Sequence, residues 1–133
     1  MTIIIPAYNP DFHLLDVVKE LKDYNIIVVD DGSSSKEIFD KLKNVTLLKH
    51  DINMGKGKAM KTAMEYVYKN NLDDGIIFVD ADGQHKTKDI KKIINIFNRN
   101  KDSLILGVRS FDKNVPFKSR MGNKITKYLF RLF

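Results

Sequence analysis

The sequence contains no cysteine, which excludes disulfide bonds and thiolate metal sites and fits a reducing compartment such as the cytoplasm. A chain of 133 residues, 43% of them hydrophobic, must therefore rest on core burial, and it has the length of one globular domain. Long apolar runs are also missing, because Ile3, Ile4 and Ile5 are followed at once by Pro6 and no basic leader precedes them. This pattern argues against a signal peptide and against a membrane-spanning helix.

Acidic residues are absent after Asp112, although the chain contains 17 of them. Residues 1–112 carry no net charge, so the formal charge of +6 belongs to residues 113–133. A nucleic-acid-binding domain more often spreads its basic residues over a folded face, so we expect no nucleic-acid partner. We predict a globular core at 1–112 and a specialised basic segment at 113–133.

The C-terminal segment has the pattern of an amphipathic helix from residue 117 onward. Such a helix could lie on an anionic membrane surface or receive a lipid phosphate, which would place the protein at the inner face of the membrane. It could equally pack on the domain with its basic face in solvent. The apolar positions are Phe117, Met121, Ile125, Leu129 and Leu132, and the basic positions are Arg120, Lys124, Lys127 and Arg131.

Short β-branched runs alternate with stretches of helical periodicity. The runs are almost continuously apolar, as expected for strands buried on both faces. The alternation predicts an α/β fold, with a Rossmann-like, mostly parallel sheet and helices on both faces. The predicted strands are 2–5, 26–29, 45–48, 76–79 and 104–108, and the helical stretches lie at 14–21, 59–67 and 90–97.

Small polar clusters follow the first, second and fourth predicted strands. In open α/β sheets, ligands bind outside the carboxyl ends of the strands, so we expect these three loops to share one crevice. The clusters are Pro6-Ala7-Tyr8-Asn9, Asp30-Asp31-Gly32-Ser33 and Asp80-Ala81-Asp82-Gly83-Gln84.

Asp80 and Asp82 are the most specific signal, since residues two apart at a strand end can project to the same side. Two carboxylates about 4 Å apart repel by roughly 4 kcal/mol at an effective dielectric of about 20, and a bound cation relieves this repulsion. Hard oxygen ligands suit Mg²⁺ or Mn²⁺ held partly by phosphates, and the Gln84 carbonyl could add another oxygen. A solvated Asp-x-Asp-Gly turn is the ordinary alternative, but the position after a buried strand favours a metal site.

The loops after the second and third predicted strands allow two interpretations each. Asp30 and Asp31 could accept hydrogen bonds from a ribose diol or a base N–H, or they could belong to an ordinary turn. In that turn, Ser34 and Glu37 could form a capping box for the next helix. Residues 53–59 open a helix whose exposed N–H groups could face an anion, but they lack the full dinucleotide-binding and P-loop patterns.

Two further residues are weaker candidates. Arg109 follows the fifth predicted strand and could clamp a diphosphate, although a surface arginine is the simpler interpretation. His85 could be a metal ligand or a general base, yet a lone loop histidine is usually neither. No Ser-His-Asp arrangement is evident, and we assign no catalytic residue.

Four motifs, in their order and spacing, resemble glycosyltransferase family 2 over nearly the whole chain. Within that family, Asp-Ala-Asp-Gly-Gln followed by Gly107-Val108-Arg109 and Arg120-Met121-Gly122-Asn123 is most similar to the polyprenyl-phosphate glycosyltransferases, relatives of dolichol-phosphate mannose synthase. The motifs are Ile-Pro-Ala-Tyr-Asn at 5–9, Val-Val-Asp-Asp-Gly-Ser at 28–33, Asn53 with Gly55-Lys56-Gly57, and Val-Asp-Ala-Asp-Gly-Gln-His at 79–85.

The resemblance implies a GT-A fold and an inverting transfer from a UDP- or GDP-linked sugar to a polyprenyl phosphate or a glycan. It also implies that Asp80, Asp82 and Gln84 hold Mg²⁺ or Mn²⁺, which would stabilise charge on the departing nucleoside diphosphate. A lipid phosphate is already anionic and needs no general base, whereas a sugar hydroxyl does. The donor-binding residues would be Pro6, Ala7, Tyr8, Asn9, Asp30, Asp31, Gly57, Lys58, Asp80, Ala81, Asp82 and Arg109.

The chain departs from the family pattern in two places. Pro10 stands where the family commonly has an acidic residue, which removes one nucleotide contact unless Asp11 replaces it. Family members also usually continue into an acceptor-binding half, so we expect a truncated chain or a naturally partial protein, which could be inactive alone.

Two other functions compete with glycosyl transfer. The motif at 79–83 also resembles the nucleophile loop of haloacid-dehalogenase-like Mg²⁺-dependent phosphatases, where it normally follows the first strand and continues into Thr. A non-catalytic membrane-surface module would instead use the basic segment and leave the site vestigial.

Overall fold

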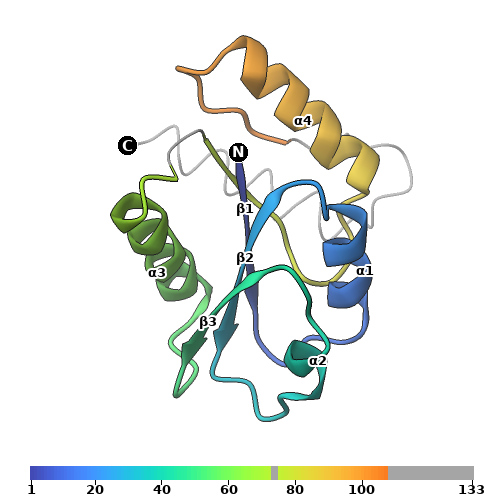
Figure 1. Ribbon diagram of the computed structural model, residues 1–133, viewed down its shortest axis with the longest axis vertical. Helices are drawn as coiled ribbons and strands as arrows, with labels where there is room; N and C mark the ends of the chain where they lie inside the picture. The colour runs from blue at the N-terminus through green and yellow to red at the C-terminus, as the bar shows by residue number, and fades with distance from the viewer. Residues whose placement is uncertain (73–74, 108–133) are drawn as a thin grey trace, which may run out of the picture.

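The computed structural model describes residues 1–72 and 75–107, which form parallel strands flanked by helices (Figure 1). The α/β class and the mostly parallel sheet predicted from the sequence are confirmed. In chain order the elements are β1 (Thr2–Ala7), α1 (His13–Glu20), β2 (Asn25–Asp31), α2 (Glu37–Asp40), β3 (Thr46–His50), α3 (Lys56–Lys69), β4 (Ile76–Phe78) and α4 (Thr87–Arg99).

The strand order is β3-β2-β1-β4, and every neighbouring pair is parallel. From β1 the chain adds β2 and β3 on one side, and α3 then returns it to the other side, where β4 pairs with β1 (Figure 1). The order therefore reverses between β1 and β4. Such a switch point leaves a crevice beyond the strand ends, where open α/β sheets bind their ligands.

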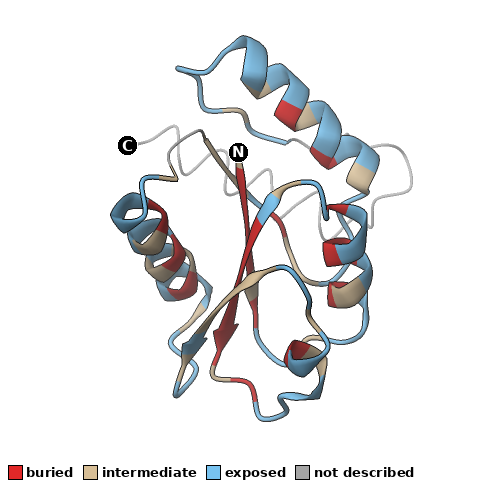
Figure 2. Ribbon diagram, viewed as in Figure 1, coloured by how far each residue is buried: buried red, intermediate tan, exposed pale blue. Residues whose placement is uncertain are grey.

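The central strands β1 and β2 are buried along almost their whole length, as the apolar runs predict (Figure 2). Successive residues of β1 belong to different core clusters on opposite faces of the sheet. Ile3 and Ile5 belong to a core cluster formed with helices α1, α2 and α4. Ile4 belongs to a second cluster with Ala59 and Ala63, so α3 covers the other face. Full burial of each isoleucine contributes about 1.5–3 kcal/mol. Helices on both faces thus hold the strand ends in place.

One predicted strand is wrong, and one local structure that the sequence allowed does not form. The described part of the fifth predicted strand, Leu104–Gly107, is not a strand, because it pairs with no strand of the described sheet. Leu104 is 85% exposed there, so an apolar pattern without a ladder partner did not form a strand. The capping box is also absent, since Ser34 donates both its N–H and its hydroxyl to Asn9 Oδ1 in another loop.

Residues 108–133 lie outside the described residues. They include the predicted boundary at residue 112, Arg109 and the basic segment 113–133. Among the helices that the structure does describe, none combines the length and the apolarity needed to cross a bilayer.

Candidate functional site

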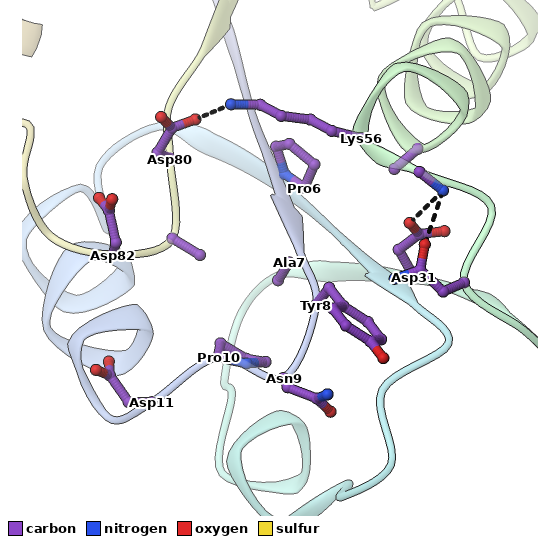
Figure 3. Close-up of a pocket in the computed structure, with 14 residues that line it drawn as sticks. Pro6, Ala7, Tyr8, Asn9, Pro10, Asp11, Asp31, Lys56, Asp80 and Asp82 are labelled. Carbon is purple, nitrogen blue, oxygen red and sulfur yellow. Dashed lines mark hydrogen bonds and ion pairs between the residues drawn. The ribbon is translucent and has the colours of Figure 1, made fainter. Parts of the chain in front are cut away.

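A cleft of about 520 Å³ lies beyond the carboxyl ends of β1, β2 and β4, beside the start of α3 (Figure 3). The three polar loops all contribute to it, at the point where the strand order reverses. Its contact with a nucleotide sugar stays a prediction. Of the predicted donor-binding residues, those that line the cleft are Pro6, Ala7, Tyr8, Asn9, Asp31, Asp80, Ala81 and Asp82.

The remaining predicted residues lie elsewhere. Gly57 and Lys58 belong to the first turn of α3, and neither they nor Gln84 line the cleft. Asp30 is fully buried and accepts hydrogen bonds from Ser33 N at 2.9 Å and from Lys36 Nζ at 2.7 Å. These two hydrogen bonds indicate that Asp30 stabilises the loop after β2.

Burial of Asp30 alone would raise the pKa of its carboxyl. The hydrogen bonds from Lys36 and Ser33 outweigh that burial and hold the pKa below its ordinary value. Asp30 is therefore ionised at neutral pH, and its charge is used within the fold.

Asp31 lines the cleft, but its oxygens are already bonded. Oδ1 accepts the N–H of Met54 at 3.0 Å and contacts His50 Nδ1 at 2.7 Å, and Oδ2 accepts the N–H of Gly55 at 2.9 Å. His50 Nε2 lies 2.9 Å from the hydroxyl of Thr62 on α3. Although burial opposes ionisation, these hydrogen bonds lower the pKa of Asp31. Asp31 thus fastens the start of α3 to the end of β2.

A glycine and an asparagine bring the loops close together. Gly32 has φ +72°, and a Cβ there would lie 2.2 Å from the carbonyl carbon of Ile52, so only glycine fits between the two backbones. Asn9 has φ +47° and donates its N–H to Ser33 Oγ at 2.9 Å, while its side chain accepts from Ser34. The loop after β1 is therefore tied to the loop after β2.

Asp80 and Asp82 stand on the loop after β4, and Figure 3 shows Asp80 directed toward Lys56 at the start of α3. Lys56 Nζ lies 2.5 Å from Asp80 Oδ1, and His85 Nε2 lies 3.5 Å from Asp80 Oδ2. The hydrogen bond from Lys56 is the main cause of the lowered pKa of Asp80. Asp82 Oδ1 accepts the N–H of Gln84 at 3.0 Å.

The carboxylate oxygens of Asp80 and Asp82 fit a hard divalent cation that is also coordinated by phosphates. Within 1–72 and 75–107, no group of three or more His, Asp or Glu side chains could hold a metal by itself. Asp80 and Asp82 offer carboxylate oxygens, which Mg²⁺ and Mn²⁺ prefer, and these ions commonly complete their shells with water and phosphate. The ion pair between the Lys56 ammonium and Asp80 shows that this carboxylate already binds a positively charged group.

Sequence reasoning missed several residues that line the cleft. Lys56 lies in the 53–59 segment, yet its pairing with Asp80 depends on the return of the chain by way of α3, which spacing alone does not reveal. Asp11 does line the cleft, and its Oδ1 accepts from His13 N at 2.9 Å. The other lining residues outside the predicted set are Pro10, Asn53, Gly55 and Ala59.

The family model described as glycosyl transferase family 2 matches residues 2–132 of the chain. A UDP-N-acetylglucosamine–dolichyl-phosphate N-acetylglucosaminyltransferase of Methanococcus voltae is 35% identical, with 91% of this chain and 58% of the relative covered. An uncharacterized protein of Methanocaldococcus jannaschii is 33% identical over 92% of this chain and 57% of its own length.

A dolichyl-phosphate beta-glucosyltransferase of Trichomonas vaginalis is 27% identical, with 86% of this chain and 41% of the relative covered. The chain thus spans little more than half of the two archaeal relatives and less of the Trichomonas protein. No solved structure is significantly similar to it.

Proposed function

The chain belongs to glycosyl transferase family 2, and on that premise we propose that it is the donor-binding part of an inverting, metal-dependent glycosyltransferase. The donor in this proposal is a UDP- or GDP-linked sugar. The observation that carries it is the cleft itself, in which Asp80 and Asp82 stand opposite the start of α3 at the switch point of a parallel sheet. One wall offers carboxylates for a cation, and the other offers amide groups for an anion.

The nucleotide is proposed to lie along the loop after β1. Pro6 and Ala7 form part of the cleft lining, and the ring of Tyr8 is about half exposed beside them (Figure 3). An exposed aromatic ring offers a flat apolar face for a base. Hydrogen bonds with Ser33 and Ser34 hold Asn9 in place, so this part of the cleft does not need a ligand to become ordered.

The diphosphate is proposed to lie between the start of α3 and the loop after β4. No side chain caps the first turn of α3. The N–H of Lys58 already donates to the carbonyl of Gly55 at 2.9 Å, so an anionic group would use the N–H groups of Lys56 and Gly57 and the positive end of the helix dipole. Gly55 has φ +88° with open space around its Cα, which lets a ligand approach the backbone closely. Arg109, outside the described residues, would add a bidentate contact.

Asp80 and Asp82 would hold the Mg²⁺ or Mn²⁺ ion, with Gln84 as a third ligand. When bound, the ion supplies a Lewis acid that offsets the charge on the departing nucleoside diphosphate. An aspartate carboxyl is ionised at neutral pH, and the hydrogen bond from Lys56 lowers the pKa of Asp80 further. Asp82 keeps its orientation through the N–H of Gln84.

The acceptor we propose is a polyprenyl phosphate. Two relatives are named for transfer to dolichyl phosphate, and both are longer than this chain. An acceptor phosphate is already anionic near neutral pH, so its oxygen needs no general base to attack the sugar. We place the protein at the inner face of the membrane, with residues 117–133 of the basic segment toward anionic lipid.

The phosphatase alternative has less support. Asp80 and Asp82 follow β4, whereas the phosphatase motif follows the first strand, and the family match runs through the whole region. Mg²⁺-dependent hydrolysis of an aryl phosphate, lost in Asp80→Asn, would favour that alternative. Liposome binding without any nucleotide binding would favour the membrane-surface module.

Calorimetry with UDP- and GDP-sugars, with and without Mn²⁺, tests the proposal. We expect binding of at least one donor class that requires Mn²⁺ and is lost in Asp82→Asn. Asp23→Asn is the matched control, because Asp23 is exposed and precedes β2 at the opposite end of the sheet. Donor binding that is absent throughout, or that is equal with and without metal, would contradict the proposal.

A further inference from the structure

Lys56 forms an ion pair that reaches from one wall of the cleft to the other. Its Nζ lies 2.5 Å from Asp80 Oδ1, and Figure 3 shows the lysine chain extended from the start of α3 past Pro6 to the loop after β4. Both residues line the cleft. The pair therefore joins the proposed cation ligand to the proposed diphosphate site.

The backbone next to Lys56 is held by hydrogen bonds that do not involve the lysine side chain. Asp31 accepts the N–H groups of Met54 and Gly55, and Gly55 turns the chain into α3 through a positive φ. Asp31, at the buried end of β2, thus determines where the backbone of Lys56 lies. A flexible four-carbon stem and a compact ammonium allow the side chain to change partners without moving that backbone.

Both partners are solvent-exposed, Lys56 at 59% and Asp80 at 40% of their side chains. An exposed ion pair contributes little to folding and is readily exchanged. A divalent ion carries twice the charge of the ammonium, and the two compete for the same carboxylate. When a divalent ion takes Asp80, the displaced ammonium needs another negative partner.

We propose that Lys56 is an internal counterion of the cation site: it occupies Asp80 until a divalent ion binds with a nucleoside diphosphate, and it then contacts that diphosphate. This inference rests on the proposed function and adds a binding order to it. The divalent ion alone must displace Lys56 and leave the ammonium without a partner. The ion together with a diphosphate supplies the partner, so the two ligands bind cooperatively through Lys56.

The experiment measures Mn²⁺ affinity by the loss of the free-ion paramagnetic resonance signal, with no nucleotide and with saturating UDP or GDP. In the native sequence we expect weak Mn²⁺ binding that the nucleotide strengthens. Lys56→Gln should bind Mn²⁺ alone about fivefold more tightly, the factor that an exposed ion pair allows, and should lose most of the gain from nucleotide. Lys56→Arg retains a charge and should resemble the native sequence.

Lys61→Gln is the matched control, because Lys61 is an exposed residue of α3 that does not line the cleft. It should leave both affinities unchanged. Equal Mn²⁺ affinities and an equal nucleotide gain in Lys56→Gln and the native sequence would overturn the counterion role alone. A native chain that binds neither Mn²⁺ nor nucleotide in any combination would overturn the proposed function as well.

Discussion

The ring of His50 lies with Nδ1 2.7 Å from Asp31 Oδ1, and both side chains are almost completely buried, at 8% and 4% exposure. The other ring nitrogen contacts Thr62 on α3. His50 ends β3 and Asp31 ends β2, so this pair joins two strand ends to the helix that begins at the cleft. The geometry of the cleft therefore depends on a residue that does not line it.

Replacement of His50 by alanine should destabilise the fold by about 1–3 kcal/mol, because the buried carboxylate of Asp31 loses a hydrogen-bond partner. Urea denaturation followed by circular dichroism measures this change. His13→Ala serves as the control, since His13 is exposed and its partner Asp11 remains hydrated. Equal midpoints for the two variants would show that the His50 contact carries no stability.

Stability should fall as the pH is lowered into the acidic range. Asp30 and Asp31 have pKa values below their ordinary range in the fold, so the unfolded chain binds protons first as the pH falls. Their contribution is fully present above the unfolded pKa and is lost as the pH drops through the folded pKa, between about pH 5 and pH 2. Urea midpoints measured across this range should decrease steadily. Asp30→Asn should flatten the decrease, and an unchanged slope would contradict this assignment.

Gly32 and Gly57 should respond in opposite directions to substitution by alanine. At Gly32 a methyl group meets the backbone of Ile52 and φ is positive, so Gly32→Ala should cost more than about 2 kcal/mol. At Gly57 a Cβ meets nothing within 4 Å and the backbone is helical, so alanine should stabilise by up to about 1 kcal/mol. Thermal unfolding compares the two directly. Similar shifts would mean that the loops do not pack as described.

Asn9 should tolerate glycine better than alanine. Both changes remove the side-chain oxygen that accepts from Ser34, but alanine also adds strain at φ +47°. We expect Asn9→Ala to be less stable than Asn9→Gly by about 1 kcal/mol. Both variants should bind nucleotide more weakly, because the hydrogen bonds from Ser34 to the Asn9 side chain no longer join the loops after β1 and β2. Nucleotide affinity equal to that of the native chain would argue against a nucleotide along this loop.

Local patterns predicted the elements whose residues are apolar on both faces. The apolar run at Ile3–Ile5 predicts a strand buried on both faces, and the structure confirms that burial in β1, which lies between β2 and β4. Leu104–Gly107 is also apolar, yet it pairs with no strand of the described sheet, and Leu104 is 85% exposed. An apolar run therefore does not by itself identify a strand partner or guarantee burial.

Long-range contacts account for the parts of the site that the sequence did not reveal. The loops after β1, β2 and β4 were predicted to meet because parallel strands end at one edge, and they do. The pairing of Lys56 with Asp80 joins residues 24 positions apart, and the hydrogen bond from the N–H of Gly55 to Asp31 spans the same separation. Neither residue type nor spacing distinguishes these contacts from an exposed lysine and an ordinary turn.

We propose above all that a divalent ion joins Asp80 and Asp82 to the diphosphate of a nucleotide-linked donor. Anomalous scattering from a crystal containing Mn²⁺ and UDP or GDP tests this claim most directly. We predict one manganese peak between the two carboxylates and the diphosphate, with Lys56 moved from Asp80 to a phosphate oxygen. A nucleotide bound in the cleft with no manganese at these carboxylates would contradict the account.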